Sequence, residues 1–324
     1  MSAPLPPDSN PRRGPLDRLR RRLRAPLMAG VVRLLAALFA LLPWGVAQRA
    51  GRAVGRLGWR VARRERRRAL EHLALAFPER AEDERRRIAR ASFLHLGTVL
   101  GEMLWLFTRD CDALERHLRV EGLERVQELH REGRPLLLFT GHCGNWEMLA
   151  SLVNCRGVPT AVVARALDEA PLQRLLLAAR NRFGTRVIDR GGSGAARELL
   201  RAMRTGVLGM LIDQDTRVEG VWVPFFGRPA YTPLGAARLA LRRGVVTIPA
   251  FIERLPDGSH HARFLEPLEL PDDEVAATER MTRCIEDHIR RRPEQWVWMH
   301  RRWRRRPAAG TDPAAGSDLG ETGR

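Results

Sequence analysis

Residues 135–148 read PLLLFTGHCGNWEM, an apolar run that ends in a glycine-containing corner. The run at 135–140 has the length and composition of a buried strand, and apolar residues at helical spacing follow it over 148–154. Gly141 and Gly144 accept the backbone angles that a sharp strand-to-helix corner requires. We therefore predict a buried strand, a tight turn and a helix at this point.

The same alternation continues along the chain. Short apolar runs bounded by turn residues lie at 160–164, 186–188, 207–212 and 245–251. Helical patterns lie at 63–77, 82–107, 171–183, 195–205 and 233–243. This order predicts an α/β fold with a mostly parallel central sheet flanked by helices. In such sheets the reactive side chains gather in loops at the carboxyl ends of the strands.

The composition excludes several classes of protein. With 324 residues, of which 44% are hydrophobic and 29% charged, the chain is no mini-protein, low-complexity disordered chain or multi-span membrane protein. Its four cysteines, Cys111, Cys143, Cys155 and Cys284, share no C-x-x-C spacing. That pattern signals neither a disulfide framework nor a thiolate zinc site. A reducing cytoplasm is therefore the expected compartment.

The net charge of +18 is concentrated at the two ends of the chain. Residues 1–68 contain seventeen arginines and three acidic residues, and residues 289–306 contain eight arginines and one glutamate. The body between them is close to neutral. A nucleic-acid-binding domain would carry its basic stripe on the folded body, so we expect an anionic membrane surface, and no nucleic acid, as the partner of these ends.

Residues 25–47 are apolar except for Arg33, and as a helix they would extend about 34 Å at about 1.5 Å per residue. Arg33 and Pro43 interrupt the segment, and arginines flank it on both sides. Because both flanks favour anionic headgroups, we predict an in-plane or re-entrant membrane anchor in preference to a crossing helix. A buried core helix is the alternative, and a cleaved signal peptide fits least.

The chain is expected to divide into four parts. They are a disordered basic N-terminus at 1–24, a hydrophobic anchor segment at 25–62, a globular domain at 63–306 and a disordered tail at 307–324.

The strongest chemical signal is the pair His142 and Glu147, which lies where the strand at 135–140 ends. On a continuous helix these side chains would point about 140° apart, so they need the turn that Gly141 and Gly144 supply. We expect Glu147 to reach back to one imidazole nitrogen of His142. A carboxylate there raises the basicity of the other nitrogen, which is what a general base acting on an alcohol requires.

Other interpretations of this corner are weaker. A lone histidine is often a buried side chain satisfied by local hydrogen bonds. His142 and Cys143 lack partners at metal-ligand spacing, so no metal is expected. Cys143 as a nucleophile is disfavoured because sequence neighbours on a turn usually point apart. The G-x-S-x-G elbow of a serine hydrolase is absent from the sequence.

Three blocks carry a family resemblance: the H-x-x-x-x-E box at 141–147, the segment Asp213-Gln214-Asp215 with VWVPFFG at 221–227, and PEQWVWMHRRW at 293–303. In this order they resemble the lipid A biosynthesis acyltransferases of the lysophospholipid acyltransferase superfamily, over roughly residues 27–306. The resemblance implies a glycerolphosphate-acyltransferase-like fold, with 63–306 as the acyltransferase domain. It also implies an O-acyltransferase at the cytoplasmic face of the bacterial inner membrane.

The resemblance implies acyl transfer from an acyl carrier protein thioester to a hydroxyl of a membrane glycolipid, with no cofactor. His142 would deprotonate that hydroxyl and Glu147 would orient His142. Backbone amides of the turn at 144–146 are our candidates for stabilising the oxyanion. Two alternatives stay open: an acyltransferase of another glycolipid, such as a phosphatidylinositol mannoside, that uses acyl-coenzyme A, and a catalytically silent membrane-binding homologue.

The remaining candidate residues each have a structural alternative. The resemblance implies a functional arginine after the H-x-x-x-x-E box, and Arg182 matches it best, with Arg180 close in register. Arg182 would bind an anionic group or simply cap a helix. The acidic block corresponds to Asp213 or Asp215, which would act at the sheet edge or belong to a turn. The other candidates for substrate binding are Asn145, Arg190 beside a glycine pair, and Phe225 and Phe226, which would wall an acyl pocket or pack in the core. Trp296, Trp298 and Trp303 suit a membrane interface or ordinary packing equally.

Overall fold

The computed structural model describes residues 30–31, 33–164, 170–189 and 194–307. A seven-stranded sheet forms its centre, with strand order β1-β9-β8-β2-β5-β3-β4. Its strands are β1 (Leu118–Glu121), β2 (Leu136–Thr140), β3 (Thr160–Ala164), β4 (Arg186–Asp189), β5 (Val207–Leu211), β8 (Val246–Arg254) and β9 (His260–Phe264). Every neighbouring pair is parallel except β8 and β9, so the predicted α/β fold with a mostly parallel sheet is confirmed.

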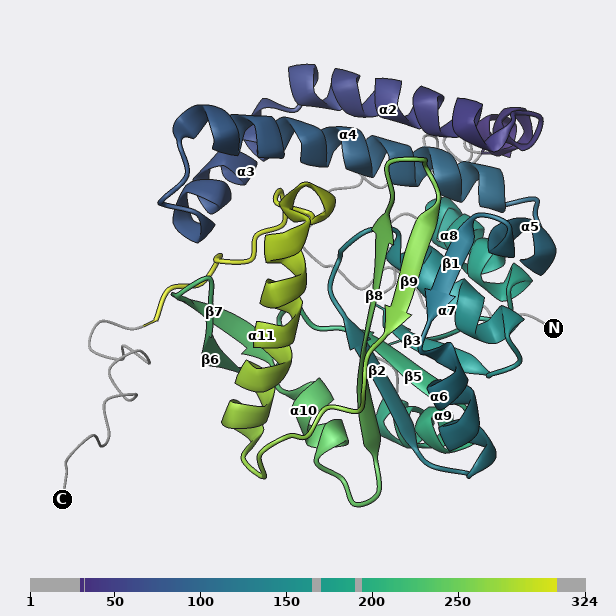
Figure 1. The fold of residues 1–324 in the computed structure, drawn as a ribbon, viewed down its shortest axis with the longest axis vertical. Helices are drawn as coiled ribbons and strands as arrows, with labels where there is room; N and C mark the ends of the chain where they lie inside the picture. The colour runs from purple at the N-terminus through teal and green to yellow at the C-terminus, as the bar shows by residue number, and fades with distance from the viewer. Residues whose placement is uncertain (1–29, 32, 165–169, 190–193, 308–324) are drawn as a thin grey trace, which may run out of the picture.

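Helices cover both faces of this sheet (Figure 1). They are α2 (Trp44–Val61), α3 (Arg63–Ala76), α4 (Glu82–Leu106), α5 (Cys111–Glu115), α6 (Leu123–Arg131), α7 (Trp146–Cys155), α8 (Ala170–Arg182), α9 (Ala195–Thr205), α10 (Gly235–Ala240) and α11 (Glu274–Arg291). A 3-10 turn follows at Pro293–Gln295, and a two-stranded sheet is formed by β6 (Gly220–Phe225) and β7 (Arg228–Pro233).

Alternate residues of β2 supply the two halves of the core, because side chains of a strand point to opposite faces. Leu136 and Leu138 pack against α6 and α7. Leu137 faces α9 and α10, and Phe139 faces α10 and α11. All five residues of β2 are buried, as the apolar run at 135–140 predicts for a central strand with both faces covered.

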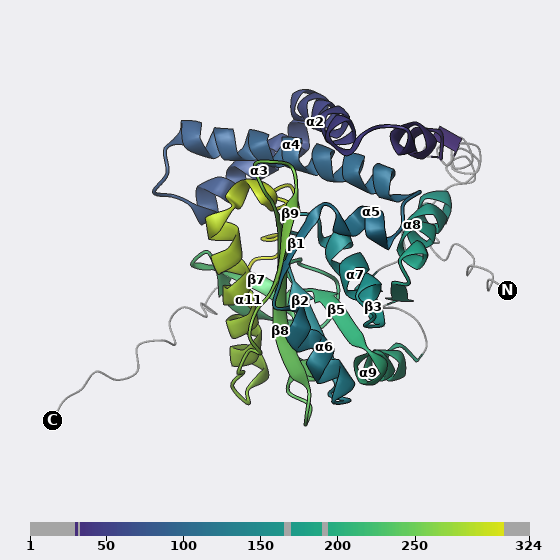
Figure 2. The same ribbon diagram turned by 45° about the vertical axis from the view of Figure 1, so that its right-hand side comes forward.

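Helices α2 and α4 lie side by side across one end of the molecule (Figures 1 and 2). Their close approach depends on glycine, because a Cβ added at Gly51 or Gly55 would meet the backbone of α4. A Cβ added at Gly97 or Gly101 would in turn meet the backbone of α2. Small residues therefore let the two backbones touch. Part of the predicted anchor segment at 25–62 is thus helix α2, packed on the folded body.

No helix in the described part of the chain combines the length and the hydropathy needed to cross a bilayer. Residues 33–40 are helical and a turn follows at 41–42. The predicted disordered N-terminus at 1–24 lies outside the described residues, as does the tail beyond residue 307.

One expectation from the cysteines was wrong. Cys111 and Cys155 form a disulfide across 44 residues of sequence. Cys111 begins α5 and Cys155 ends α7, and these two helices pack together in one core cluster. Cysteine spacing carries no information about such a pairing, because only the packing of the two helices brings the thiols together.

Candidate active site

The corner between β2 and α7 has the predicted form. Strand β2 ends at Thr140 and α7 begins at Trp146. Gly144 has φ +58°, and a Cβ there would collide with the carbonyl oxygen of Ile252. The position therefore requires glycine for both its conformation and its surroundings. The side chain of Asn145 accepts a hydrogen bond from Met148 N and so caps the first turn of α7.

His142 lies in this corner and is held by Asp213. The Nδ1 atom of His142 is 2.6 Å from Asp213 Oδ1, and the backbone N–H of His142 donates to Asp213 Oδ2 at 2.7 Å. Asp213 follows β5, which is the parallel neighbour of β2 in the sheet. Because parallel neighbours end at the same edge, the two residues meet across 71 positions of sequence.

Gly141 makes room for this contact. A Cβ at Gly141 would stand 3.0 Å from Asp213 Oδ2 and 2.8 Å from a methyl group of Ile285. The glycine before the histidine is therefore needed for space, whereas Gly144 is the corner glycine that adopts a positive φ.

Asp213 is fully buried and yet ionised. Burial alone would raise its pKa, but the charge of His142 and hydrogen bonds from His142 and Trp296 outweigh burial and hold the pKa of Asp213 far below its ordinary value. An ionised carboxylate only accepts hydrogen bonds, so Nδ1 of His142 carries the proton that it donates to Asp213. The Nε2 atom of His142 is then the basic nitrogen.

Glu147 does not contact His142, contrary to our expectation. Its two carboxylate oxygens accept from Nε and Nη2 of Arg180, at 2.9 and 2.6 Å. Both side chains are largely buried, with 16% and 14% of their surface exposed. Glu147 lies on the first turn of α7, whereas Asp213 already occupies the Nδ1 side of His142. The carboxylate that orients the histidine is therefore Asp213.

Two further polar residues stand beside His142 that the motifs did not single out. The side-chain nitrogen of Gln214 lies 3.0 Å from His142 Nε2 and 2.9 Å from His300 Nδ1. Burial, together with the charge of His142, lowers the pKa of His300 to about 4, so His300 is neutral at pH 7. Gln214 lies inside the acidic block and His300 inside the C-terminal block, so both were visible in the sequence, but no spacing rule joins them.

The C-terminal block at 293–303 packs against Asp213 and Cys143. The indole Nε1 of Trp296 donates to Asp213 Oδ2 at 2.7 Å, and Trp296 also forms an isolated β-bridge with Cys143. Trp296 and Trp298 are fully buried and Trp303 is partly buried. The tryptophans Trp296 and Trp298 are therefore packing residues rather than a membrane-interface belt.

An apolar cavity of about 40 Å³ adjoins the corner between β2 and α7. It lies between α7 and the strands β2, β3 and β5. Its lining includes Leu138, Thr140, Trp146, Ala150, Val162 and Met210. Trp146 connects the cavity to the histidine, because its ring makes an edge contact with His142 at a centroid distance of 5.0 Å.

The remaining candidates are distributed as follows. Arg182 is exposed and donates to the carbonyl oxygens of Thr108 and Arg109. Asp215 pairs with Arg304 and Arg305, away from His142. These contacts do not join Arg182 or Asp215 to His142.

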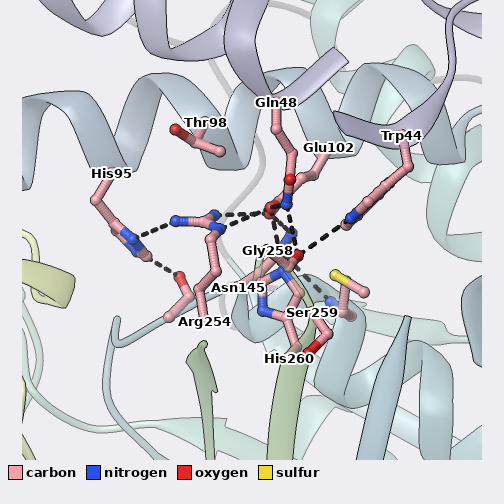
Figure 3. Close-up of polar contacts among 12 residues, drawn as sticks. Trp44, Gln48, His95, Thr98, Glu102, Asn145, Arg254, Gly258, Ser259 and His260 are labelled. Atoms are coloured by element: carbon pink, nitrogen blue, oxygen red, sulfur yellow. Dashed lines mark hydrogen bonds and ion pairs between the residues drawn. The ribbon is translucent and has the colours of Figure 1, made fainter. Parts of the chain in front are cut away.

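Phe225 and Phe226 belong to the aromatic core around Trp296 and Trp298 and do not line the cavity. Asn145 caps α7 and donates to Glu102 (Figure 3). Arg190 lies outside the described residues.

The structure also bears on two of the weaker interpretations, Cys143 as a nucleophile and a metal site. Burial, followed by the charge of Asp213, raises the pKa of the Cys143 thiol well above its usual range, and Cys143 packs in the core. A buried neutral thiol is a poor nucleophile. Among the residues that the structure describes, no group of three His, Cys, Asp or Glu side chains gathers as metal ligands. The amide of Gly144, one of the expected oxyanion donors, instead donates to Gln295 O.

The fold and the site together define an α/β enzyme whose basic histidine stands beside an apolar cavity. Residues 18–305 match the family model of the bacterial lipid A biosynthesis acyltransferases, and the chain belongs to this family. It is therefore an O-acyltransferase.

Curated relatives share most of the length of this chain. A lipid A biosynthesis lauroyltransferase of Escherichia coli (strain K12) is 29% identical over 82% of this chain and 88% of its own. A myristoyltransferase of the same organism is 27% identical over 84% of each chain. A palmitoleoyltransferase of that organism is 26% identical over 83% of this chain and 89% of its own.

Proposed function

We propose that the protein transfers a fatty acyl chain from an acyl carrier protein thioester to a hydroxyl group of a lipid A-type glycolipid precursor. The observation that carries this proposal is the pair His142–Asp213 at the sheet edge, beside an apolar cavity. A base alone would fit many reactions. A base next to an apolar cavity, in a member of this family, fits the attack of an alcohol on a fatty acyl thioester.

The reaction follows from the state of His142. Its Nε2 takes the proton of the acceptor hydroxyl as the oxygen attacks the thioester carbonyl, and a tetrahedral oxyanion forms. When the oxyanion collapses, the carbon–sulfur bond breaks and the leaving thiolate receives the proton from His142. The products are an ester and a free thiol, with no covalent enzyme intermediate. Asp213 stays ionised and stabilises the imidazolium between the two proton transfers.

Gln214 occupies the place of the acceptor hydroxyl in the free enzyme. Its side-chain nitrogen lies within hydrogen-bond distance of His142 Nε2, the atom that must receive the proton. The acceptor hydroxyl replaces this contact on binding. Gln214 and His300 then remain beside the reacting oxygen as polar neighbours.

Glu147 acts through Arg180 in this proposal. Their double hydrogen bond joins the first turn of α7 to the last turn of α8. A bidentate arginine–carboxylate pair fixes geometry as well as charge. The pair therefore holds the helix that carries Trp146 and lines one wall of the cavity.

We propose that the enzyme lies on a membrane surface. The reason is that helix α2 carries an exposed apolar stripe and an arginine stripe in addition to the face that packs on α4. Ala47, Gly51 and Gly55 are buried against α4. A second stripe is apolar but exposed and consists of Val54, Leu57 and Val61, with exposed fractions of 50%, 57% and 65%.

A third stripe carries Arg49, Arg52, Arg56 and Arg60, all exposed. An in-plane helix buries its apolar stripe in the bilayer and keeps its arginines at the level of anionic headgroups. The helical stretch at 33–40 before α2 also exposes apolar side chains, namely Leu34, Leu35 and Leu38. We therefore propose that the protein lies on the cytoplasmic face of the inner membrane.

The test is an acyl-transfer assay with purified protein, radiolabelled acyl carrier protein thioesters and a membrane lipid extract. We expect label in a glycolipid with the wild type and none with His142→Ala, and the mass of the labelled lipid identifies the acceptor. If label moves only from acyl-coenzyme A, the proposed donor is wrong. If a phosphatidylinositol mannoside is labelled, the proposed acceptor is wrong. Absence of transfer from both donors favours a catalytically silent homologue.

A further inference from the structure

A buried polar cluster, drawn in Figure 3, adjoins the corner between β2 and α7 through Asn145. Its centre is Glu102, a fully buried carboxylate in the last two turns of α4. Five N–H groups point at its two oxygens. They come from Gln48, Asn145, Arg254, which gives two, and His260, at 2.8 to 3.1 Å.

The charge of Glu102 is maintained by these partners. Burial opposes ionisation, but His260 and Arg254 outweigh it and hold the pKa of Glu102 well below its usual value. A buried carboxylate with this many donors is a rigid acceptor, because no rotation of the group would improve its contacts.

Two connections lead from this cluster to the catalytic corner. The first is direct: Asn145 Nδ2 donates to Glu102 Oε2 at 2.9 Å, while Asn145 Oδ1 caps α7. Since an ionised carboxylate only accepts, Glu102 decides which end of the Asn145 amide faces the helix.

The second connection passes through His95. The Nη1 atom of Arg254 lies 2.6 Å from His95 Nδ1, and His95 Nε2 lies 3.2 Å from the carbonyl oxygen of Gly144. Arginine only donates, so Nδ1 of His95 accepts and its Nε2–H donates to Gly144. Burial, followed by the charge of Arg254, lowers the pKa of His95 well below its usual value, which keeps the ring neutral.

We propose that Glu102 is a positioning residue for acyl transfer: with Arg254 and His95 it fixes residues 144 and 145, and thereby the position of His142 relative to the cavity. Neither Glu102 nor Arg254 lines the cavity or contacts His142. The role rests on the proposed function above. It differs from ordinary core packing because both connections end on Gly144 and Asn145, two of the three residues that join His142 to α7.

The central experiment compares Glu102→Gln, Asn145→Asp and the double variant. Each single change places two donors or two acceptors face to face, whereas the double variant restores one carboxylate opposite one amide. We expect kcat to fall at least tenfold in each single variant, with KM for donor and acceptor within about twofold, and to recover in part in the double variant. Glu253→Gln is the matched control, because its carboxylate lies on the neighbouring position of β8 and pairs with Arg292 instead.

A second readout does not depend on turnover. The rate at which diethyl pyrocarbonate modifies His142, followed by peptide mass across pH, reports the environment of the imidazole. We expect this rate profile to change in Glu102→Gln and to stay unchanged in Glu253→Gln. A wild type that transfers no acyl chain defeats the proposed function, and the modification profile still decides the positioning role.

Thermal unfolding separates positioning from stability alone. If Glu102→Gln lowers only the unfolding midpoint, and the folded enzyme keeps its kcat and its modification profile, the proposal is overturned. If Glu102→Gln does not fold, two variants of His95 test the positioning role. His95→Leu should lower kcat and His95→Gln, which can still accept from Arg254 and donate to Gly144, should restore it. Equal kcat for His95→Leu and the wild type overturns the proposal.

Discussion

The carboxylate of Asp213 contacts His142 twice, at the imidazole Nδ1 and at the backbone N–H. The double contact fixes the ring and its main chain together, and the indole of Trp296 holds the second carboxylate oxygen at 2.7 Å. The basic nitrogen of His142 is therefore aimed by a residue that follows the neighbouring strand β5.

Asp213→Asn should remove most activity and leave the fold intact. The asparagine keeps the size of the side chain and can accept from Trp296, but its amide no longer stabilises an imidazolium. We expect kcat to fall about 10²- to 10⁴-fold, the range for loss of general-base function. The measurement is kcat in the acyl-transfer assay, with circular dichroism as the check on folding. Wild-type turnover by Asp213→Asn would remove Asp213 from the mechanism.

Arg180 and Arg182 form a matched pair of substitutions. Arg180→Gln leaves the carboxylate of Glu147 largely buried without its hydrogen-bond donors, and we expect a loss of about 1–3 kcal/mol in the free energy of unfolding. We also expect kcat to fall about 10- to 100-fold, because α7 shifts. Arg182→Gln should change stability by less than about 0.5 kcal/mol. Urea denaturation measures the stability of both variants and steady-state kinetics measures their kcat. A larger loss in Arg182→Gln than in Arg180→Gln would show that Arg182 is the functional arginine after the box.

The cavity should set the preferred acyl length. Ala150→Phe fills it and should shift the optimum to shorter donors, whereas Met210→Ala enlarges it and should favour longer ones. Each methylene that gains or loses its apolar contact is worth about 0.8 kcal/mol, or about fourfold in kcat/KM. A series of acyl carrier protein thioesters of increasing length gives the profile. Unchanged profiles in both variants would place the acyl chain elsewhere.

The exposed stripe of α2 should bind anionic vesicles. Val54→Asp combined with Leu57→Asp should weaken partition into vesicles that contain an anionic lipid at least about tenfold, because each apolar side chain contributes about 1.5–3 kcal/mol on burial. Added salt should weaken wild-type binding through the arginine stripe. Val275→Asp, an exposed apolar position on α11, is the control. Equal pelleting of all three proteins would contradict the in-plane arrangement.

The stability of the protein should fall on acidification below pH 6.5. Burial lowers the pKa of His288 to about 3 and that of His300 to about 4. In this range the unfolded chain binds protons at these histidines and the folded protein does not, so stability rises with pH between about 4 and 6.5. Each histidine contributes a slope of up to about 1.4 kcal/mol per pH unit.

Urea midpoints at pH 7, 6 and 5 test this dependence. His288→Gln removes one titrating group, so its stability should depend less steeply on pH than that of the wild type. A variant with the wild-type slope would show that His288 titrates alike in both states.

The sequence alone indicated much of the fold because its central strands are fully buried. The runs at 135–140, 160–164 and 207–212 became β2, β3 and β5, since a parallel strand covered on both faces is a continuous apolar run. Strand β9 was missed because its buried residues His260, Ala262 and Phe264 alternate with His261 and Arg263 and form no such run. The hairpin β6–β7 was missed because its prolines conceal the strand pattern.

Local sequence was also sufficient for the catalytic corner and its histidine. A strand end, two glycines and a helix cap lie within a dozen residues. These local features are enough to predict the turn and the position of His142 at the end of the strand. The partner of His142 was beyond local sequence, because Glu147 is near in the chain but points to Arg180. Asp213 reaches Nδ1 only because β5 is placed beside β2. Long-range packing of helices and strands likewise decided the Cys111–Cys155 disulfide and the donors around Glu102, since such contacts depend on which elements pack together and not on their spacing in sequence.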